Sequence, residues 1–353
     1  MIHSFKNKEG KTAWRSPSNI AIVKYWGKFG IQLPRNPNIS FTLSNAYTDT
    51  KIEYKLKTTN TQSINVDFLF EEKPNPKFRE KIIRFLESIT EQLPYLNYFN
   101  LKISSSNSFP HSAGIASSAS SMSALALCLL DIEQQVSGEI SEEEFYKKAS
   151  IIARLGSGSA CRSVFPYMAA WGISENIPDS DNEYAISFGS AIHDVFKTYK
   201  DAILIVSSDE KSVSSRAGHA LMENNLFADA RYQQANQNMS ALLSALKNGD
   251  TDAFGQIAEQ EALSLHALMM CSNPSFILMQ PNTLKIIDLI KQFRQKNSVS
   301  LYFTLDAGPN VHLLYPKSEE RKVEDFVEYE LREYCENRKV IYDEVGAGPV
   351  KLK

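Results

Sequence analysis

A stretch of small residues between a predicted strand and a predicted helix constrains the fold of this chain most. The residues FNLKISSS (99–106) predict a strand, and SALALCLLDIEQQV (123–136) predicts a helix. The segment SAGIASSASSMSAL (112–125) connects them and opens the helix. Such a loop either directs backbone N–H groups and the helix dipole at an anion, or lets the helix start close against a sheet. It lacks the G-x-x-x-x-G-K-[ST] pattern, which excludes the usual P-loop, and alone it favours both readings equally.

A second stretch of small residues, GSGSACRS (156–163), is also suited to binding an anion. It follows SEEEFYKKASIIARLG (141–156), whose cap-and-acid opening predicts a helix. Gly and Ser bring backbone N–H groups and hydroxyls close to an anion, and Arg162 adds charge and a two-pronged donor. The stretch is therefore suited to a phosphate or a carboxylate.

The rest of the chain mixes helices and strands, which predicts an α+β fold. A chain of 353 residues is longer than a single hydrophobic core usually supports, so we expect two domains. We place the boundary between Pro178 and Phe196. Polar residues from 172 to 184 form either an exposed hairpin or the approach to that boundary. The strands are expected at 48–56, 64–70, 201–207 and on both sides of DAGPN (306–310). The remaining helices are expected at 78–93, 217–246, 252–270, from 283 and at 318–337.

Composition argues against several classes of protein. The net charge of −3 and the pI near 6.1 leave no electrostatic footprint for nucleic acid or an anionic membrane. No apolar run approaches the length of a membrane span, and the first ten residues lack the apolar core of a signal peptide. Four widely spaced cysteines indicate neither a disulfide framework nor a zinc site. The expectation is a reduced, cytoplasmic protein that binds small molecules.

A cationic stretch and an acidic turn are the other candidates for chemistry. In SPSNIAIVKYWGKFG (16–30), Lys24 and Lys28 would share one face of a strand. They would form a wall for a polyanion or simply protect a sheet edge. Asp306 ends an apolar run, so it is either a base or metal ligand at a strand end or a turn-forming residue. The histidines show no metal-ligand spacing, and we read them as ordinary side chains.

Taken together, the motifs resemble one enzyme family. SNIAIVKYWGK (18–28), FPHSAGIASSAS (109–120), GSGSACRS, VSSRAG (213–218) and DAGPN occur in the order of the diphosphomevalonate decarboxylase family. That family belongs to the superfamily of galactokinase, homoserine kinase, mevalonate kinase and phosphomevalonate kinase. The resemblance implies an α+β small-molecule-kinase fold. An N-terminal, ATP-binding domain like ribosomal protein S5 would cover residues 1–187, and a C-terminal α+β domain 188–353, with the active site in the cleft.

The resemblance also implies a reaction and its participants. Family members convert (R)-5-diphosphomevalonate and ATP into isopentenyl diphosphate, ADP, phosphate and CO₂ through a 3-phosphorylated intermediate, with Mg²⁺. The step belongs to the mevalonate pathway of isoprenoid biosynthesis. A cytoplasmic homodimer without nucleic-acid or membrane partners is implied as well.

Site residues are carried over position by position. The residues implied in catalysis are Asp306 as the acid–base group, Lys24 as its cationic partner, Arg162 and Asn19. The residues implied in substrate binding are Tyr25, Lys28, Ser157, Gly158, Ser159, Arg162, Ser215 and Arg216. The residues implied in ATP binding are Asn107, Pro110, Gly114, Ala116, Ser117, Ser118 and Ser120. Ser118 is the implied protein contact of Mg²⁺, which is held mainly by the ATP phosphates.

Three other functions stay open at this point. A kinase could phosphorylate the 3-hydroxyl and stop, a relative could decarboxylate a monophosphate, and a regulator could bind ATP without catalysis. Retention of both Lys24 and Asp306 argues against the first and third, and three cations beside the second loop suit a diphosphate. The chain departs from the family at His111–Ser112, often Thr-Ala, and at ALSLHA (262–267), often Ser-Asn-Gln-Phe-His-Ala.

Overall fold

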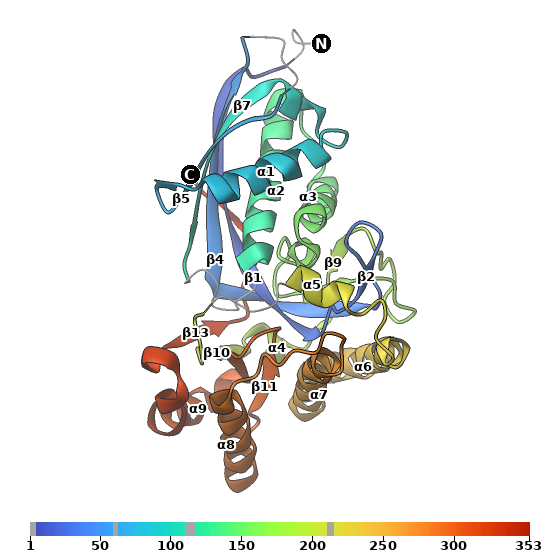
Figure 1. Cartoon of the computed structure of the whole chain (residues 1–353), viewed down its shortest axis with the longest axis vertical. Coiled ribbons are helices and arrows are strands. Elements are labelled where there is room, and N and C mark those ends of the chain that lie inside the picture. The colour runs from blue at the N-terminus through green and yellow to red at the C-terminus, as the bar shows by residue number, and fades with distance from the viewer. Residues whose placement is uncertain (1–4, 59–62, 110–116, 210–214) are drawn as a thin grey trace.

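The structure is a computed structural model that describes residues 5–58, 63–109, 117–209 and 215–353. Figure 1 shows an elongated molecule with the N-terminal sheet and its helices at one end and the C-terminal elements at the other. Both halves mix helices and strands, which confirms the expected α+β class. No helix of the described residues is both long and apolar enough to cross a membrane.

The N-terminal half is built on a large sheet. Over the described residues it has eight strands, in the order β14-β1-β4-β7-β5-β6, with β8 paired to β4 and β9. Its pairs are antiparallel except for β5 with β7, which are parallel. The strands are β1 (Glu9–Val23), β4 (Asn38–Leu56), β5 (Asn65–Phe70), β6 (Lys73–Pro74), β7 (Phe99–Asn107), β8 (Met168–Trp171), β9 (Ala185–Ser187) and β14 (Val350–Lys351). A separate hairpin joins β2 (Lys28–Phe29) to β3 (Leu33–Pro34).

Three helices cover one face of this sheet (Figure 1). They are α1 (Pro76–Ser88), α2 (Ser117–Ser137) and α3 (Glu142–Gly156). α2 is buried around most of its surface, and small residues at its start allow this close packing. The expected strand, loop and helix at 99–136 are confirmed as β7 and α2. Ser141 caps α3 by accepting a hydrogen bond from the backbone N–H of Glu144.

The C-terminal half packs helices on both faces of a smaller sheet. Over the described residues this antiparallel sheet has four strands, in the order β11-β12-β10-β13. Alternate residues of its strands belong to two buried clusters, one shared with α6 and α7 and the other with α8 and α9. The elements are α4 (Asp194–Lys197), β10 (Lys200–Leu204), α5 (Ser215–Ala220), α6 (Ala228–Asn248), α7 (Thr251–Met270), α8 (Pro281–Asn297), β11 (Tyr302–Leu305), β12 (Val311–Tyr315), α9 (Glu320–Phe326) and β13 (Val340–Glu344).

The two halves share apolar core and backbone pairing. One buried cluster contains Ile20 and Phe41 of the large sheet together with Phe196 and Phe254 of the C-terminal half. β14, near the end of the chain, returns to pair with β1. The division at residues 187 and 188 stays a prediction.

Three predicted helices are wrong in extent. The helix expected at 78–93 ends at Ser88 in α1. The helix expected at 217–246 is broken into α5 and α6, because the Asn225 side chain accepts a hydrogen bond from the Phe227 backbone N–H at 2.9 Å and so favours a turn. The helix expected at 318–337 is regular only over α9. It continues as a wider turn at Val327–Leu331 and a tight turn at Arg332–Tyr334, and it ends where Cys335 adopts an extended backbone with a φ of −89° and a ψ of 140°.

Candidate active site

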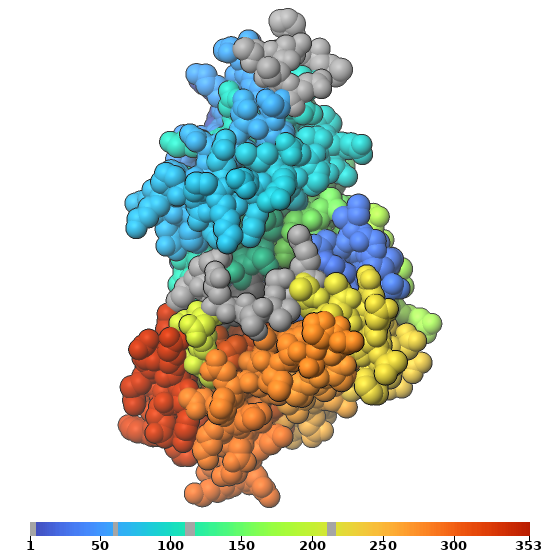
Figure 2. Space-filling model, in the orientation of Figure 1, coloured from blue at the N-terminus to red at the C-terminus, as the bar shows by residue number. Residues whose placement is uncertain are grey.

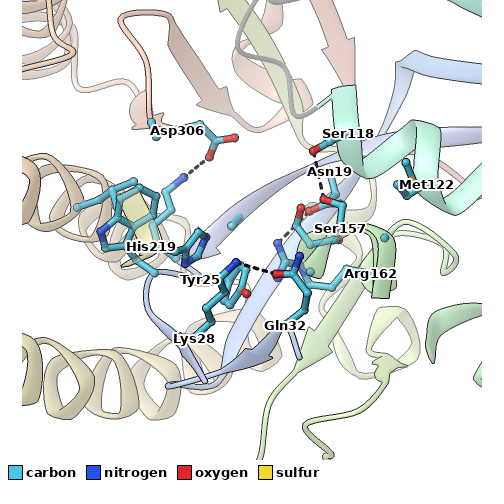
Figure 3. Close-up of a pocket in the computed structure, with 18 residues that line it drawn as sticks. Asn19, Tyr25, Lys28, Gln32, Ser118, Met122, Ser157, Arg162, His219 and Asp306 are labelled. Carbon is cyan, nitrogen blue, oxygen red and sulfur yellow. Dashed lines mark hydrogen bonds and ion pairs between the residues drawn. The ribbon is translucent and has the colours of Figure 1, made fainter. Parts of the chain in front are cut away.

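A cavity of about 280 Å³ lies between the two halves, lined by segments from both. Figure 3 shows Asp306 and Ser118 pointing into it from one side and Lys28 and Arg162 from the other. In Figure 2 the blue surface that includes the β2–β3 hairpin borders the yellow segment that includes α5. The lining residues are Asn19, Ala21, Lys24, Tyr25, Trp26, Lys28, Gln32, Ser118, Met122, Gly156, Ser157, Gly158, Ser159, Arg162, His219, Leu265, Asp306 and Ala307.

Lys24 and Asp306 form an ion pair in this cavity. The Nζ atom of Lys24 lies 3.2 Å from Oδ1 of Asp306, which follows β11 in the C-terminal half. The Lys24 side chain is 2% exposed and that of Asp306 27%, so the carboxylate is the accessible partner. Burial lowers the pKa of Lys24, and the Asp306 carboxylate opposes that shift. The pair is a carboxylate held next to a desolvated ammonium group, open to a ligand on one side.

The strand expected over 16–30 is shorter in the structure. β1 ends at Val23, and Gly27 adopts a φ of 95°, which turns the chain into the β2–β3 hairpin. Lys24 and Lys28 therefore do not share a strand face. They reach the same cavity from the end of β1 and from β2, where Lys28 Nζ donates to Gln32 Oε1 at 3.1 Å.

Arg162 is buried beneath the cavity with neutral hydrogen-bond partners. Its Nε donates to Ser40 Oγ at 2.8 Å, its Nη2 to Asn19 Oδ1 at 3.1 Å, and its Nη1 to Asn38 Oδ1. The side chain is 2% exposed, and burial lowers its pKa from the ordinary value. A buried cation whose hydrogen-bonded partners are all neutral favours an anionic ligand. Asn19, which also donates to Ser163 Oγ at 2.8 Å, orients the guanidinium.

Aromatic rings form the wall beside Arg162. The hydroxyl of Tyr25 is buried and has no hydrogen-bond partner within the described part of the chain. Its ring lies between Trp171 and His219, with centroids at 4.7 and 4.3 Å. A Cβ atom on Gly158 would come within 2.8 Å of the Tyr25 ring, so only glycine fits this close approach. The Tyr25 hydroxyl thus lacks a partner within the described residues, although Tyr25 lines the cavity.

The two Gly/Ser stretches meet at the cavity. Ser118 at the start of α2 and Ser157 after α3 have their hydroxyl oxygens 3.2 Å apart. Ser117, Ser118 and Met122 also line a second cavity of about 210 Å³. This neighbour is mainly apolar, and its aromatic residues are Phe68, Phe70 and Phe78. Ser118 and Met122 line both cavities, so the two cavities adjoin each other.

Sequence comparison with known families covers most of the chain. Residues 16–183 match the Diphosphomevalonate decarboxylase-like N-terminal domain, and residues 202–351 match the Mevalonate 5-diphosphate decarboxylase C-terminal domain. The chain belongs to the diphosphomevalonate decarboxylase family. The enzyme from Candida albicans is 31% identical over 87% of this chain and 85% of its own length, and that from Saccharomyces cerevisiae is 31% identical over 88% and 79%.

Solved structures of this decarboxylase family have the same fold. A structure of MDDEF in complex with MVAPP, AMPPCP and magnesium is 28% identical, with a TM-score of 0.82 over 97% of this chain and 99% of that one. Mevalonate diphosphate decarboxylase from Staphylococcus aureus is 27% identical, with a TM-score of 0.82 and 98% of each chain covered. The first of these relatives therefore binds an ATP analogue and magnesium together.

Not every implied site residue reaches a cavity. The side chains of Ser120 and Asn107 both bond Thr48 inside the protein, at 2.7 and 2.8 Å, and neither lines the two cavities described above. Pro110, Gly114, Ala116 and the His111–Ser112 departure lie outside the described residues. Ser215 and Arg216 begin α5, the helix that also carries His219, and their side chains lie outside the described part of the chain.

Sequence reasoning missed several residues around this family member's site. His219 was read as ordinary, yet it lines the cavity and its Nδ1 accepts the Gly27 backbone N–H at 3.0 Å. Burial, assisted by the Lys28 charge, lowers its pKa to about 3, so the ring is neutral. Its place three residues after Arg216, directly after the VSSRAG segment, is the signal that could have found it. No sequence motif indicated Glu261, which contacts Lys24, and none indicated the aromatic cavity.

Proposed function

We propose that this chain catalyses the ATP-dependent decarboxylation of (R)-5-diphosphomevalonate to isopentenyl diphosphate, ADP, phosphate and CO₂. One observation carries the proposal: a Lys24–Asp306 ion pair shares one cavity with a buried Arg162 whose hydrogen-bond partners are neutral. The pair suits phosphorylation of a hydroxyl, and the arginine suits a carboxylate. A kinase that stopped at the phosphate ester would need only the first.

Asp306 is proposed to act in the phosphoryl-transfer step. A tertiary hydroxide is a poor leaving group, so the substrate's 3-hydroxyl must first become a phosphate ester. Asp306 would orient that hydroxyl and accept its proton while the oxygen bonds to the γ-phosphorus of ATP and ADP leaves. Lys24 at 3.2 Å would keep the carboxylate ionised and neutralise developing charge.

Arg162 is proposed to act in the elimination that follows. The bond from the tertiary carbon to the phosphate oxygen breaks, and positive charge develops on that carbon. The bond from the neighbouring carbon to the carboxylate then breaks, CO₂ leaves, and the electron pair forms the new double bond. Arg162, fixed by Asn19, Asn38 and Ser40, would hold the carboxylate so that the breaking bonds stay aligned.

The diphosphate is proposed to lie along the aromatic wall. The unpartnered Tyr25 hydroxyl, Lys28 and the Ser157–Ser159 stretch line this part of the cavity. Ser215 and Arg216 are proposed to complete the site from the start of α5. A hydroxyl donor, cations and small residues together match the oxygens of a diphosphate.

ATP is proposed to span the two cavities. Its phosphates would follow the loop before α2, through Pro110, Gly114, Ala116 and Ser117, and reach Asp306 past Ser118. Asn107 and Ser120 would support that loop through Thr48. Magnesium fits here because the exposed Ser118 hydroxyl offers a hard oxygen ligand beside the ATP phosphates. When bound, it supplies positive charge that neutralises the phosphates.

The aromatic cavity gives a test of nucleotide placement. Phe78 would pack against the adenine ring, so Phe78→Ala should raise the KM for ATP about tenfold and leave the KM for the acceptor near normal. Phe293→Ala is the matched control, because Phe293 stacks on Phe326 in the distant C-terminal cluster. Steady-state kinetics with each substrate varied in turn decides the question. Equal KM values for ATP in the Phe78 and Phe293 variants would show that the adenine ring does not bind in the aromatic cavity.

We also propose the division of the chain into residues 1–187 and 188–353, a cytoplasmic location and a homodimer. A cavity lined by residues of both halves supports a cleft between them, and one core cluster that contains residues of both halves supports close packing of the two domains. Light scattering of the purified protein tests the dimer, and limited proteolysis between residues 178 and 196 tests the division.

The proposed reaction makes a direct prediction about its products. Purified protein should release CO₂ from 5-diphosphomevalonate only when both ATP and Mg²⁺ are present. Omission of either should abolish release, because the elimination requires the phosphate ester. ADP formation with a stable 3-phosphorylated product and no CO₂ would identify a kinase instead.

A further inference from the structure

The main chain of Lys24 is held by a buried ion pair that the proposed mechanism does not use. Glu261 on α7 accepts the Lys24 backbone N–H at 2.8 Å. Arg231 on α6 donates to both oxygens of Glu261 and, at 3.4 Å, to the Lys24 carbonyl. Asn238 donates to Glu261 at 2.7 Å. The side chains of Arg231 and Glu261 are 2% and 0% exposed.

The same helix holds the main chain of Asp306. The Nε2 atom of His266 lies 3.0 Å from the Asp306 carbonyl oxygen. A carbonyl oxygen only accepts, so this nitrogen carries the proton and donates. α7 therefore contacts the backbone of both members of the Lys24–Asp306 pair, although neither Glu261 nor His266 lines the cavity.

Stability alone does not account for such a pair. Two buried charges lose their hydration, and apolar residues of similar volume are often as stabilising or more so. The position of Lys24 gives a better reason. It follows the last residue of β1, where the strand ladder no longer pairs its backbone, so its N–H and carbonyl need other partners. Glu261 supplies one, and Arg231 and Asn36 supply the other.

We propose that α7 aligns the Lys24–Asp306 pair, with Glu261 as the positioning residue of Lys24 and His266 as that of Asp306. Arg231 holds Glu261 in place and balances its charge. This inference rests on the proposed function of the pair. It proposes that residues which contact neither substrate affect the catalytic rate. Displacement of a catalytic group by about 1 Å is enough to slow turnover about 100-fold.

Charge around Lys24 gives the proposal a signature that a structural role lacks. The groups whose charge acts on the ammonium are Asp306, Glu261, Arg162 and His312, and Arg231 faces Lys24 from α6, where it donates to the Lys24 carbonyl oxygen. Burial lowers the Lys24 pKa, and the charge of Glu261 opposes that shift. Activity needs the ammonium, so it is lost as pH rises through this pKa. Loss of the negative charge of Glu261 should therefore move the alkaline limb of the pH–activity profile to lower pH. Loss of the positive charge of Arg231 should move this limb to higher pH.

The test compares Glu261→Gln, Arg231→Met and a matched control, Glu259→Gln. Glu259 also lies on α7 and pairs with Arg294 at 2.6 Å, outside the cavity lining. We expect Glu261→Gln to lower kcat about 10- to 100-fold with both KM values within about twofold of wild type. The alkaline limbs of kcat/KM for the Glu261 and Arg231 variants should shift in opposite directions. Glu259→Gln should keep the wild-type kcat and limb.

Several outcomes would overturn the inference. Equal kcat values in the Glu261 and Glu259 variants, or unmoved alkaline limbs in folded variants, would reduce the pair to a structural role. If Glu261→Gln fails to fold, Glu261→Met/Arg231→Met replaces both charges by apolar groups. Wild-type turnover in that double variant contradicts the proposal. A wild-type protein that forms no CO₂ contradicts the proposed function and the inference with it, whereas an active wild type beside a wild-type-like Glu261→Gln contradicts the inference alone.

His266 provides an independent test. His266→Gln keeps an N–H donor near the position of Nε2, and His266→Leu removes it. The Gln variant should retain most of the wild-type kcat, and the Leu variant should lose about tenfold or more with little change in KM. Equal losses in the two variants would contradict the role of this hydrogen bond.

Discussion

Asp306→Asn is expected to lower kcat about 1,000-fold and leave ATP binding near normal. The substitution keeps the size of the side chain and removes the group that accepts the hydroxyl proton, and general bases contribute 10²- to 10⁴-fold. Asp306 lies on the wall of the first cavity, away from the aromatic cavity proposed for the adenine ring.

The measurement combines CO₂ release with equilibrium binding of ATP. Glu259→Gln controls for general loss of a carboxylate, because Glu259 pairs with Arg294 and does not line the cavity. A variant that keeps most of the wild-type rate would remove Asp306 as the base. A variant that loses ATP affinity in parallel with rate would show that the carboxylate acts through nucleotide binding instead.

Arg162→Gln is expected to weaken binding of 5-diphosphomevalonate and slow its turnover, each about tenfold or more. The substitution removes a buried charge and leaves Asn19, Asn38 and Ser40 without their donor. Both effects follow because the guanidinium is proposed to hold the carboxylate before and during its departure. The KM for ATP should change little.

Two further variants make the Arg162 result specific. Arg162→Lys keeps the charge without the two-pronged donor, so it should bind the substrate better than Gln and still turn over slowly. Arg294→Gln removes an arginine from the other ion pair of α7 and should leave both kinetic constants unchanged. Unchanged KM and kcat in Arg162→Gln would exclude the proposed role.

Much of the fold and the central residues of the site could be predicted from local sequence patterns. Alternation predicted β5, and the Ser141 cap predicted α3, because those signals are contained in a few neighbouring residues. Lys24, Arg162 and Asp306 were found because each lies in a recognisable motif. In the structure these three residues, from distant motifs, line one cavity.

The parts that could not be predicted depend on contacts between distant segments or on competing local bonds. Glu261 meets Lys24 across 237 positions in sequence, and nothing in its own neighbourhood indicates that contact. The aromatic cavity draws Phe68, Phe70 and Phe78 from two elements. The break before α6 depends on one side-chain bond of Asn225, which outweighs the helical pattern around it.

The central claim is tested most directly by one assay of three acceptors side by side. Mevalonate, 5-phosphomevalonate and 5-diphosphomevalonate are each incubated with the protein, ATP and Mg²⁺, and ADP and CO₂ are followed together. The account predicts that 5-diphosphomevalonate gives ADP and CO₂ in equal amounts, with far higher kcat/KM than the other two. ADP without CO₂ from any acceptor, or preferred decarboxylation of 5-phosphomevalonate, would contradict it.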